Sequence, residues 1–116
     1  MTIDEFFTTS HERERPIFDV VSAHLEGLGS VVVEAVQVGI FFKNGPMFAE
    51  LRPMKKWMAL TFLHPTKLDS TRFSRKVVRA GGNGSRFYHV INVANVEQID
   101  QPVLDWLTEA YLATEQ

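Results

Sequence analysis

The hydrophobic pattern changes period twice along this chain, and this constrains the fold more than any other feature of the sequence. Near the start, apolar residues recur every three or four positions, as on one face of a helix. From residue 30 to residue 93 the chain is rich in β-branched and aromatic residues, in alternating or short apolar runs that are typical of strands. From residue 101 the helical spacing returns. The predicted order is helix, several strands, helix.

Local signals place the first helices. Thr2 and Glu5 have the spacing of a capping box, which predicts a short helical turn at the N-terminus. The segment HERERPIFDVVSAHLEGLG predicts a longer helix with Pro16 in its first turn and glycines at its end. Its expected apolar stripe consists of Ile17, Val20, Val21, His24, Leu25 and Leu28.

The central region predicts about five short strands. We expect strands over 30–43, 47–53, 57–65 and 86–93, with a hairpin turn at Asn44–Pro46. In the segment 66–78 we expect one helical turn capped by Asp69 or Ser70, followed by a basic run that forms an edge strand. Tight turns between neighbouring strands imply antiparallel pairing.

The C-terminal segment QPVLDWLTEAYLATEQ predicts an amphipathic helix, with Asn95 and Asp100 as cap candidates. Both end helices must bury their apolar stripes, and one sheet face is the available surface. We therefore predict a single α+β domain over residues 1–116. It has an antiparallel sheet of about five strands, with the N- and C-terminal helices packed on one face.

Composition excludes several classes of function. The chain has no cysteine, which rules out disulfides, thiolate metal sites and a cysteine nucleophile. The acidic N-terminus is not a signal peptide, and no apolar stretch approaches the roughly 20 residues of a membrane helix. We expect a cytoplasmic protein that does not bind membranes and carries no cofactor.

Charge is distributed unevenly. The segment from Lys43 to Arg86 has ten basic and two acidic residues, a charge of +8, whereas the rest of the chain carries −10. Such a split is typical of an anion-binding surface. It also fits basic strands that are partnered by acidic helices within one fold, and this second interpretation is the commoner one.

The stretch GGNGS at residues 81–85 is interpreted as a turn. A phosphate loop requires a lysine and a helix after its glycines, and a dinucleotide fingerprint requires a third glycine where this chain has Phe87. A strand follows instead, so we predict a hairpin loop flanked by Arg79 and Arg86.

The sequence offers little for catalysis. Its four histidines are dispersed, and the mid-strand His89 is retained as a candidate although a structural role is the commoner one. No Ser-His-Asp arrangement or paired carboxylates are recognisable. Nothing argues for an enzyme, although the question stays open. Five acids of the first helical region form a candidate for weak metal handling: Asp4, Glu5, Glu12, Glu14 and Asp19.

One sheet face remains available for binding. If Val36, Val38, Ile40 and Phe42 face the helices, the opposite face carries aromatic and basic side chains, Phe48 among them. Such a face binds single-stranded nucleic acid in some proteins and is covered by a second subunit or domain in others, and here we favour the latter. The candidate partner-binding residues are Phe41, Lys43, Arg52, Lys55, Lys56, Trp57, Arg75, Lys76, Arg86, Tyr88 and His89.

Several segments resemble an uncharacterised bacterial family, domain of unknown function fifty-six fifty-five (DUF5655). The resemblance rests on PIFDVVSAHLEGLG, VQVGIFFKNGPMFAELRP, the strand ending in LTFLHP, RFYHVINV and LDWLTEAY. It implies no agreed activity and no catalytic residues. Because members of the family occur alone or beside other domains, it implies an accessory or binding role.

More remotely, the helix–sheet–helix order is similar to the frataxin-like fold, whose members hold iron on an acidic ridge. The first helical region here has fewer acids, interrupted by Arg13 and Arg15. We therefore expect a non-enzymatic binding module that acts through the outer sheet face, as a homodimer or with another protein domain. A nucleic acid or other anionic partner on the basic segment is the first alternative, and metal handling is the second.

Overall fold

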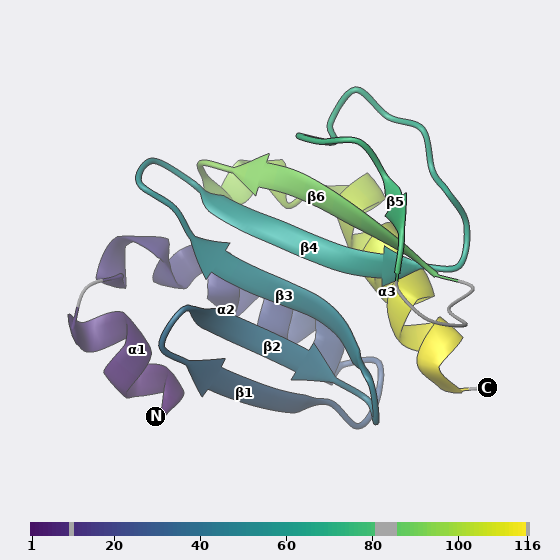
Figure 1. The fold of residues 1–116 in the computed structure, drawn as a ribbon. Helices are drawn as coiled ribbons and strands as arrows, with labels where there is room; N and C mark the ends of the chain where they lie inside the picture. Colours follow the sequence, from purple (N-terminus) through teal and green to yellow (C-terminus); the bar gives the residue numbers. More distant parts are fainter. Residues whose placement is uncertain (10, 81–85, 116) are drawn as a thin grey trace.

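The computed structural model describes residues 1–9, 11–80 and 86–115. Three α-helices, three short 3₁₀ turns and a six-stranded antiparallel sheet follow one another along the chain (Figure 1). The helices are α1 (Ile3–Thr9), α2 (Arg15–Glu26) and α3 (Gln101–Leu112), and the 3₁₀ turns are η1 (Glu12–Glu14), η2 (Val96–Gln98) and η3 (Ala113–Glu115). The strands are β1 (Val32–Val36), β2 (Gly39–Lys43), β3 (Met47–Pro53), β4 (Met58–His64), β5 (Val78–Arg79) and β6 (Phe87–Val93). Their order across the sheet is β1-β2-β3-β4-β6-β5.

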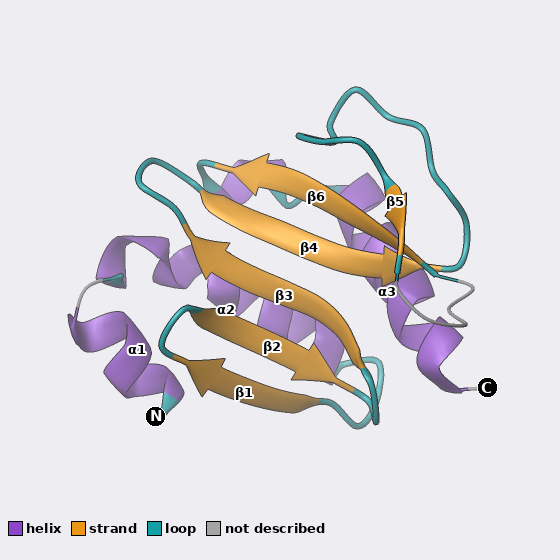
Figure 2. Cartoon of the chain, in the orientation of Figure 1, coloured by secondary structure: helices purple, strands orange, loops and turns teal. Residues whose placement is uncertain are grey.

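The helices α2 and α3 lie together behind the sheet, which confirms the predicted α+β arrangement (Figure 2). Each buries one apolar stripe, represented by Val21 and Leu25 in α2 and by Val103 and Leu107 in α3, all of which are fully enclosed. A hydrogen bond of 2.8 Å between His24 Nε2 and Thr108 Oγ1 joins the two helices. Within the described residues, no helix covers the opposite face of the sheet.

The predicted helix caps are confirmed. Thr2 and Glu5 form the expected capping box, because each backbone N–H donates to the side chain of the other, at 2.9 and 3.0 Å. The carboxylate of Asp100 accepts from the backbone N–H of Val103 at 3.4 Å and caps α3. Asn95 caps the short turn η2.

The predicted single strand over 30–43 is wrong, because the chain turns at Gln37–Val38 and forms the two strands β1 and β2. This raises the strand number to six. Val38 was predicted to face the helices, but it lies in the turn and is 56% exposed. The prediction for Val36 is also wrong. Ala35 pairs with Ile40 and both side chains are buried, and because side chains alternate along a strand, Val36 points to the opposite face.

Phe48 was predicted on the outer face, but it is fully buried and its ring packs edge-on against Tyr111 at 5.5 Å. The cause is an irregularity in the pairing of β2 with β3, where the register shifts between Phe42 and Lys43. A bulge inserts an extra residue and re-aims its side chain. Strict alternation therefore gives the wrong face at this position.

The segment between β4 and β5 follows the free side of β6. Arg72 lies in a turn, Phe73 pairs with Ile91 as an isolated bridge, and the two residues of β5 then pair with Phe87 and Tyr88. The predicted edge strand is therefore confirmed at Val78–Arg79. The segment before it forms a hydrogen-bonded turn rather than a helix, and Ser70 Oγ accepts from Arg72 N–H at 3.1 Å, as a capping residue does. The GGNGS stretch, predicted as a hairpin loop, lies outside the described residues. The residues on either side of it are joined by a hydrogen bond of 2.8 Å from Ala80 N–H to Arg86 O.

Candidate binding groove on the outer sheet face

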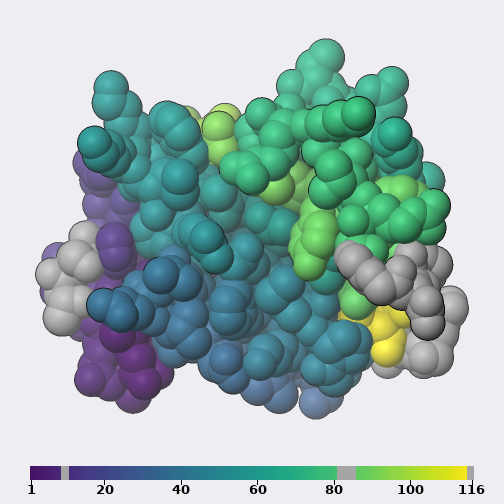
Figure 3. Space-filling view, viewed as in Figure 1, coloured from purple at the N-terminus to yellow at the C-terminus, as the bar shows by residue number. Residues whose placement is uncertain are grey.

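The floor of the groove is made by small and polar side chains on the uncovered face of β4 and β6. Ala59 and Thr61 alternate in β4 with large residues that enter the core, and they lie opposite Asn92 and Val90 of β6. Because the floor side chains are short, the surface is hollowed here. Figure 3 views this face and shows the depression between the teal β3–β4 hairpin and the green segment that precedes β6.

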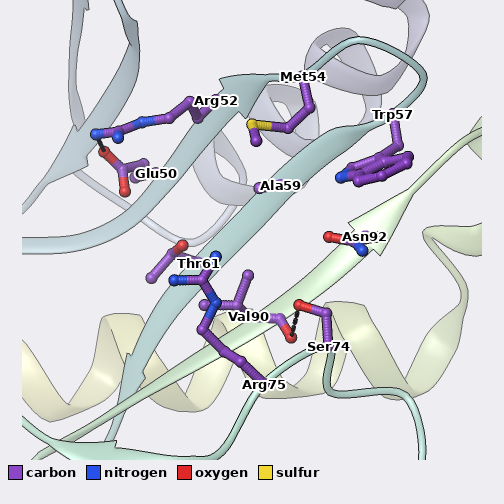
Figure 4. Close-up of a pocket in the computed structure, with 10 residues that line it drawn as sticks. All are labelled: Glu50, Arg52, Met54, Trp57, Ala59, Thr61, Ser74, Arg75, Val90 and Asn92. Atoms are coloured by element: carbon purple, nitrogen blue, oxygen red, sulfur yellow. Dashed lines mark hydrogen bonds and ion pairs between the residues drawn. The ribbon is translucent and has the colours of Figure 1, made fainter.

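Two walls enclose this floor. Glu50 and Arg52 of β3 form one wall, and Ser74 and Arg75 of the β4–β5 segment form the other, around a hollow of about 260 Å³ (Figure 4). The indole of Trp57, together with Met54, stands at one end, where the turn between β3 and β4 is closed by a 2.7 Å bond from Met54 N–H to Trp57 O.

The hollow continues toward the other end of the strands. A second depression of about 240 Å³ shares four lining residues with the first and adds Lys76, Val78 and Tyr88. The two form one groove along the outer face, which we call the outer groove. Trp57 and Tyr88 lie toward opposite ends of it, and each is 36% exposed.

The wall carrying Arg75 is held in place by its neighbours in the chain. The side chain of Arg72 donates to both carboxylate oxygens of Asp100, at 3.0 and 2.9 Å, and to Gln98 O at 2.8 Å. Ser74 donates to Val90 O from both its backbone N–H and its hydroxyl, at 2.8 and 3.2 Å. Arg75 therefore directly follows a segment whose residues Arg72 and Ser74 are both held by hydrogen bonds.

Phe73 anchors the same wall from below the sheet. Its ring packs against those of His89 at 5.0 Å, Trp106 at 5.3 Å and Phe62 at 6.3 Å. Burying an aromatic ring among such neighbours contributes on the order of 2–3 kcal/mol. The core under the sheet therefore fixes a segment that borders the groove above it.

The charge in the outer groove is predominantly positive. Glu50 is paired with Arg52, at 3.2 Å between their side chains. Among the described residues, neither Arg75 nor Lys76 makes a hydrogen bond or ion pair, and Figure 4 shows the Arg75 guanidinium extending over the floor toward Thr61. An unpaired guanidinium above a polar floor is suited to bind an anion.

The predicted binding residues are partly brought together. The groove or its margin contains Arg52, Trp57, Arg75, Lys76 and Tyr88, and Lys55 and Lys56 lie exposed in the turn beside Trp57. Phe41 lies half-buried across from Glu50, and Lys43 is paired with Glu34 at 3.2 Å, both outside the groove.

Arg86 and His89 are elsewhere. Arg86 is half-buried and donates to Met47 O at 3.4 Å. His89 is fully buried on the helix side, where its ring stacks on Phe62 at 5.0 Å. Its Nδ1 is 2.9 Å from Phe87 O, and its Nε2 accepts from Leu68 N–H at 3.1 Å. Burial lowers the pKa of His89, so the neutral ring serves as a structural link and does not reach the groove.

Three of the five candidate acids of the N-terminal region are engaged with arginines. Asp4 and Asp19 both contact Arg15, at 2.8 and 3.5 Å, and the hydrogen bond that Arg15 donates to Asp4 raises the pKa of Arg15. Glu14 lies 3.5 Å from Arg13. Within residues 1–9, 11–80 and 86–115, no three metal-ligating side chains come together.

Sequence reasoning missed part of the groove lining. Glu50, Met54, Thr61, Ser74 and Asn92 were not singled out, although all five line the hollow. A signal was present in WMALTFLHP, whose small residues Ala59 and Thr61 alternate with Met58, Leu60 and Phe62. No comparable local signal identifies Ser74.

One fold can serve many unrelated functions, so the arrangement of sheet, helices and groove does not by itself identify the protein. The family model described as "Domain of unknown function (DUF5655)" matches residues 3–114, and the chain belongs to this family. No curated protein and no solved structure matches the chain, so the resemblance to the frataxin-like fold is not confirmed. In the described part of the chain, no helix has the length and apolar character needed to cross a membrane.

Proposed function

We propose that this DUF5655 chain is a non-enzymatic binding module that takes an anionic partner in the outer groove. The observation that carries the proposal is the position of Arg75, whose guanidinium extends over the floor and, among the described residues, has no hydrogen-bonding partner. Within the described part of the chain, Lys76 adds a second unpaired positive charge along the same groove, where Glu50 is already neutralised by Arg52. A charge-assisted hydrogen bond from Arg75 to an anion contributes about 1.5–3 kcal/mol.

The anchoring of the Arg75 wall supports this role. Because Ser74 and Arg72 are tied to the sheet and to the N-terminus of α3, little conformational freedom is lost when a ligand contacts the next residue. A pre-positioned charge binds better than one on a mobile loop.

The test is a titration of the protein with a linear inorganic polyphosphate at low salt, measured by isothermal titration calorimetry. The matched variants are Arg75→Glu, inside the groove, and Lys67→Glu, an exposed residue of the same segment that does not line it. We expect Arg75→Glu to weaken binding at least about tenfold and Lys67→Glu to weaken it less than about threefold. No binding by the wild type, or equal losses in both variants, would contradict the proposal.

Self-association through the same face is the second candidate, favoured by the exposure of Trp57 and Met54 at one end of the groove and of Tyr88 toward the other. Light scattering decides between them, since a monomer has a mass of 13.2 kDa. A dimer that dissociates when Trp57 is replaced by Asp would favour this second function.

A further inference from the structure

We infer that the anionic partner of the outer groove is single-stranded nucleic acid, with bases stacked on Trp57 and phosphates held by Arg52 and Arg75. This inference rests on the proposed function and names the ligand class of the same groove. It is carried by the combination of basic side chains with exposed aromatic rings in one elongated hollow. Stacking one base on an aromatic side chain strengthens binding by roughly 5- to 150-fold, whatever the identity of the base.

The distribution of aromatic rings favours an extended ligand over a single nucleotide. Tyr88 pairs with Leu63, six residues along the sheet from the position of Trp57. At about 3.4 Å per residue, the two rings are roughly 20 Å apart. A ligand that reaches both rings must run along the strands, as an oligonucleotide does and a free phosphate or nucleotide does not.

The width of the groove favours one strand over two. Its walls are β3 and the segment at Ser74–Arg75, and only β4 and β6 lie between them. Three strand spacings of about 4.8 Å separate the walls by roughly 14 Å between backbones. A duplex keeps its bases stacked inside the helix, where they are inaccessible to Trp57, whereas unstacked single-stranded bases are available.

The floor offers hydrogen bonds to base edges. Among the described residues, the side chains of Thr61 and Asn92 have no hydrogen-bonding partner, and both line the hollow, Thr61 beside the Arg75 guanidinium and Asn92 toward Trp57 (Figure 4). An amide and a hydroxyl pair with several base edges, so they provide contacts at modest sequence preference. An acidic peptide would use the arginines but would leave the Trp57 face and these polar groups without matched partners.

The experiment compares four labelled polyanions by fluorescence anisotropy. The ligands are an oligothymidylate of about twelve nucleotides, the corresponding abasic strand, a duplex of the same length and a polyglutamate peptide. We expect the oligothymidylate to bind at least about tenfold more tightly than the abasic strand, and Trp57→Ala to remove most of that difference. Quenching of Trp57 fluorescence provides a second readout, and Trp57→Phe distinguishes it from the half-buried Trp106.

The outcomes separate this inference from the proposed function. Equal binding of the oligothymidylate and the abasic strand overturns the inference but leaves an anion-binding groove, as does tighter binding of the duplex or of polyglutamate. Binding of none of the four ligands overturns both. If Trp57→Ala melts at a lower temperature than the wild type, the variant Trp57→Phe decides, because it retains an aromatic ring. We expect Trp57→Phe to retain at least a third of the oligothymidylate affinity. A loss of affinity comparable to that of Trp57→Ala would contradict stacking.

Discussion

At the residue scale, His89 links two parts of the fold through a single neutral ring. The ring accepts the backbone N–H of Leu68 and lies enclosed beneath the sheet, with the ring of His64 at 5.9 Å. Glu109 of α3 is engaged with His64 at 2.6 Å. Adding a proton to Nε2 of His89 would place this N–H against the backbone N–H of Leu68, so that two donors would face each other.

We therefore predict that His89 makes the protein less stable in mild acid. Burial, with the charge of His64 as a smaller cause, lowers the pKa of His89 below that of a histidine in the unfolded chain, about 6.5. The contribution is fully present above pH 6.5 or so and is lost as the pH falls through the lower, folded-state pKa. The measurement is urea unfolding at several pH values from 7.5 to 5.

The variant His89→Gln removes this titrating group while keeping an acceptor for Leu68 N–H. We expect it to be less stable than the wild type at pH 7.5, because its side chain does not fill the ring's place against Phe62. The gap in the free energy of unfolding should narrow toward pH 5. A constant gap across this range would contradict the role assigned to His89.

Asp100 provides a second residue-scale prediction. It caps α3 and binds Arg72, and this arginine lowers the pKa of Asp100. Asp100→Asn retains a capping oxygen but loses the charge, so we expect a loss of only about 0.2–1 kcal/mol at neutral pH. Because the folded pKa is depressed, the deficit should disappear as the pH falls through that pKa, below about 3.9.

The matched variant Asp100→Ala removes the cap as well and should cost about 1 kcal/mol more than Asp100→Asn. Thermal unfolding followed by circular dichroism measures both. A deficit of Asp100→Asn that persists undiminished at low pH would show that the pairing with Arg72 is not its cause.

At the element scale, the β1–β2 hairpin depends on Gly39. A Cβ at this position would lie 2.7 Å from the carbonyl oxygen of Leu51 in the neighbouring strand. Because the obstacle is backbone, the strand itself must move. We predict that Gly39→Ala costs about 1–3 kcal/mol in the free energy of unfolding, measured with urea.

The control for this prediction is Gly27→Ala. Gly27 ends α2 with φ of −70°, and the nearest atom to an added Cβ is 3.4 Å away. This change is expected to be neutral or to stabilise by up to about 1 kcal/mol, because alanine restricts the unfolded chain. Equal losses in the two variants would mean that close approach of β3 is not what requires Gly39.

At the scale of the whole molecule, the distribution of charge matters more than its total. The chain has a net charge of −2, yet the outer groove has Arg52, Arg75 and Lys76 on its lining. In the N-terminal region, Asp4 and Asp19 are engaged with Arg15, and Glu14 is engaged with Arg13. An acidic protein can therefore present a positive surface to a polyanion.

This arrangement predicts a strong dependence of oligothymidylate binding on salt. Each phosphate contact adds roughly −0.7 to the slope of log K against log salt for a single strand. We expect Arg75→Ala to reduce the steepness of the slope by about 0.7, and Lys67→Ala to leave it unchanged. Fluorescence anisotropy at increasing sodium chloride measures the slope, and a slope unaltered in Arg75→Ala would remove Arg75 from the phosphate contacts.

The sequence by itself determined the features that depend on neighbours along the chain. The helical stripes, the capping box at Thr2 and Glu5, the cap at Asp100 and the turn at Asn44–Pro46 were all predicted correctly, as was the antiparallel α+β class. These follow from local hydrogen bonding and hydrophobic periodicity, which are written into a few consecutive residues.

Only the tertiary structure decided which side chains share a surface. In a sheet, a shift of one residue moves a side chain to the opposite face, and the register is set by pairing with another strand. Phe48 entered the core for this reason, at a shift in the β2–β3 pairing. Likewise, Arg75 reached the groove because Phe73 is packed against Trp106, a residue far along the chain. The physical reason is that non-local packing, which no short stretch of sequence encodes, positions the groove.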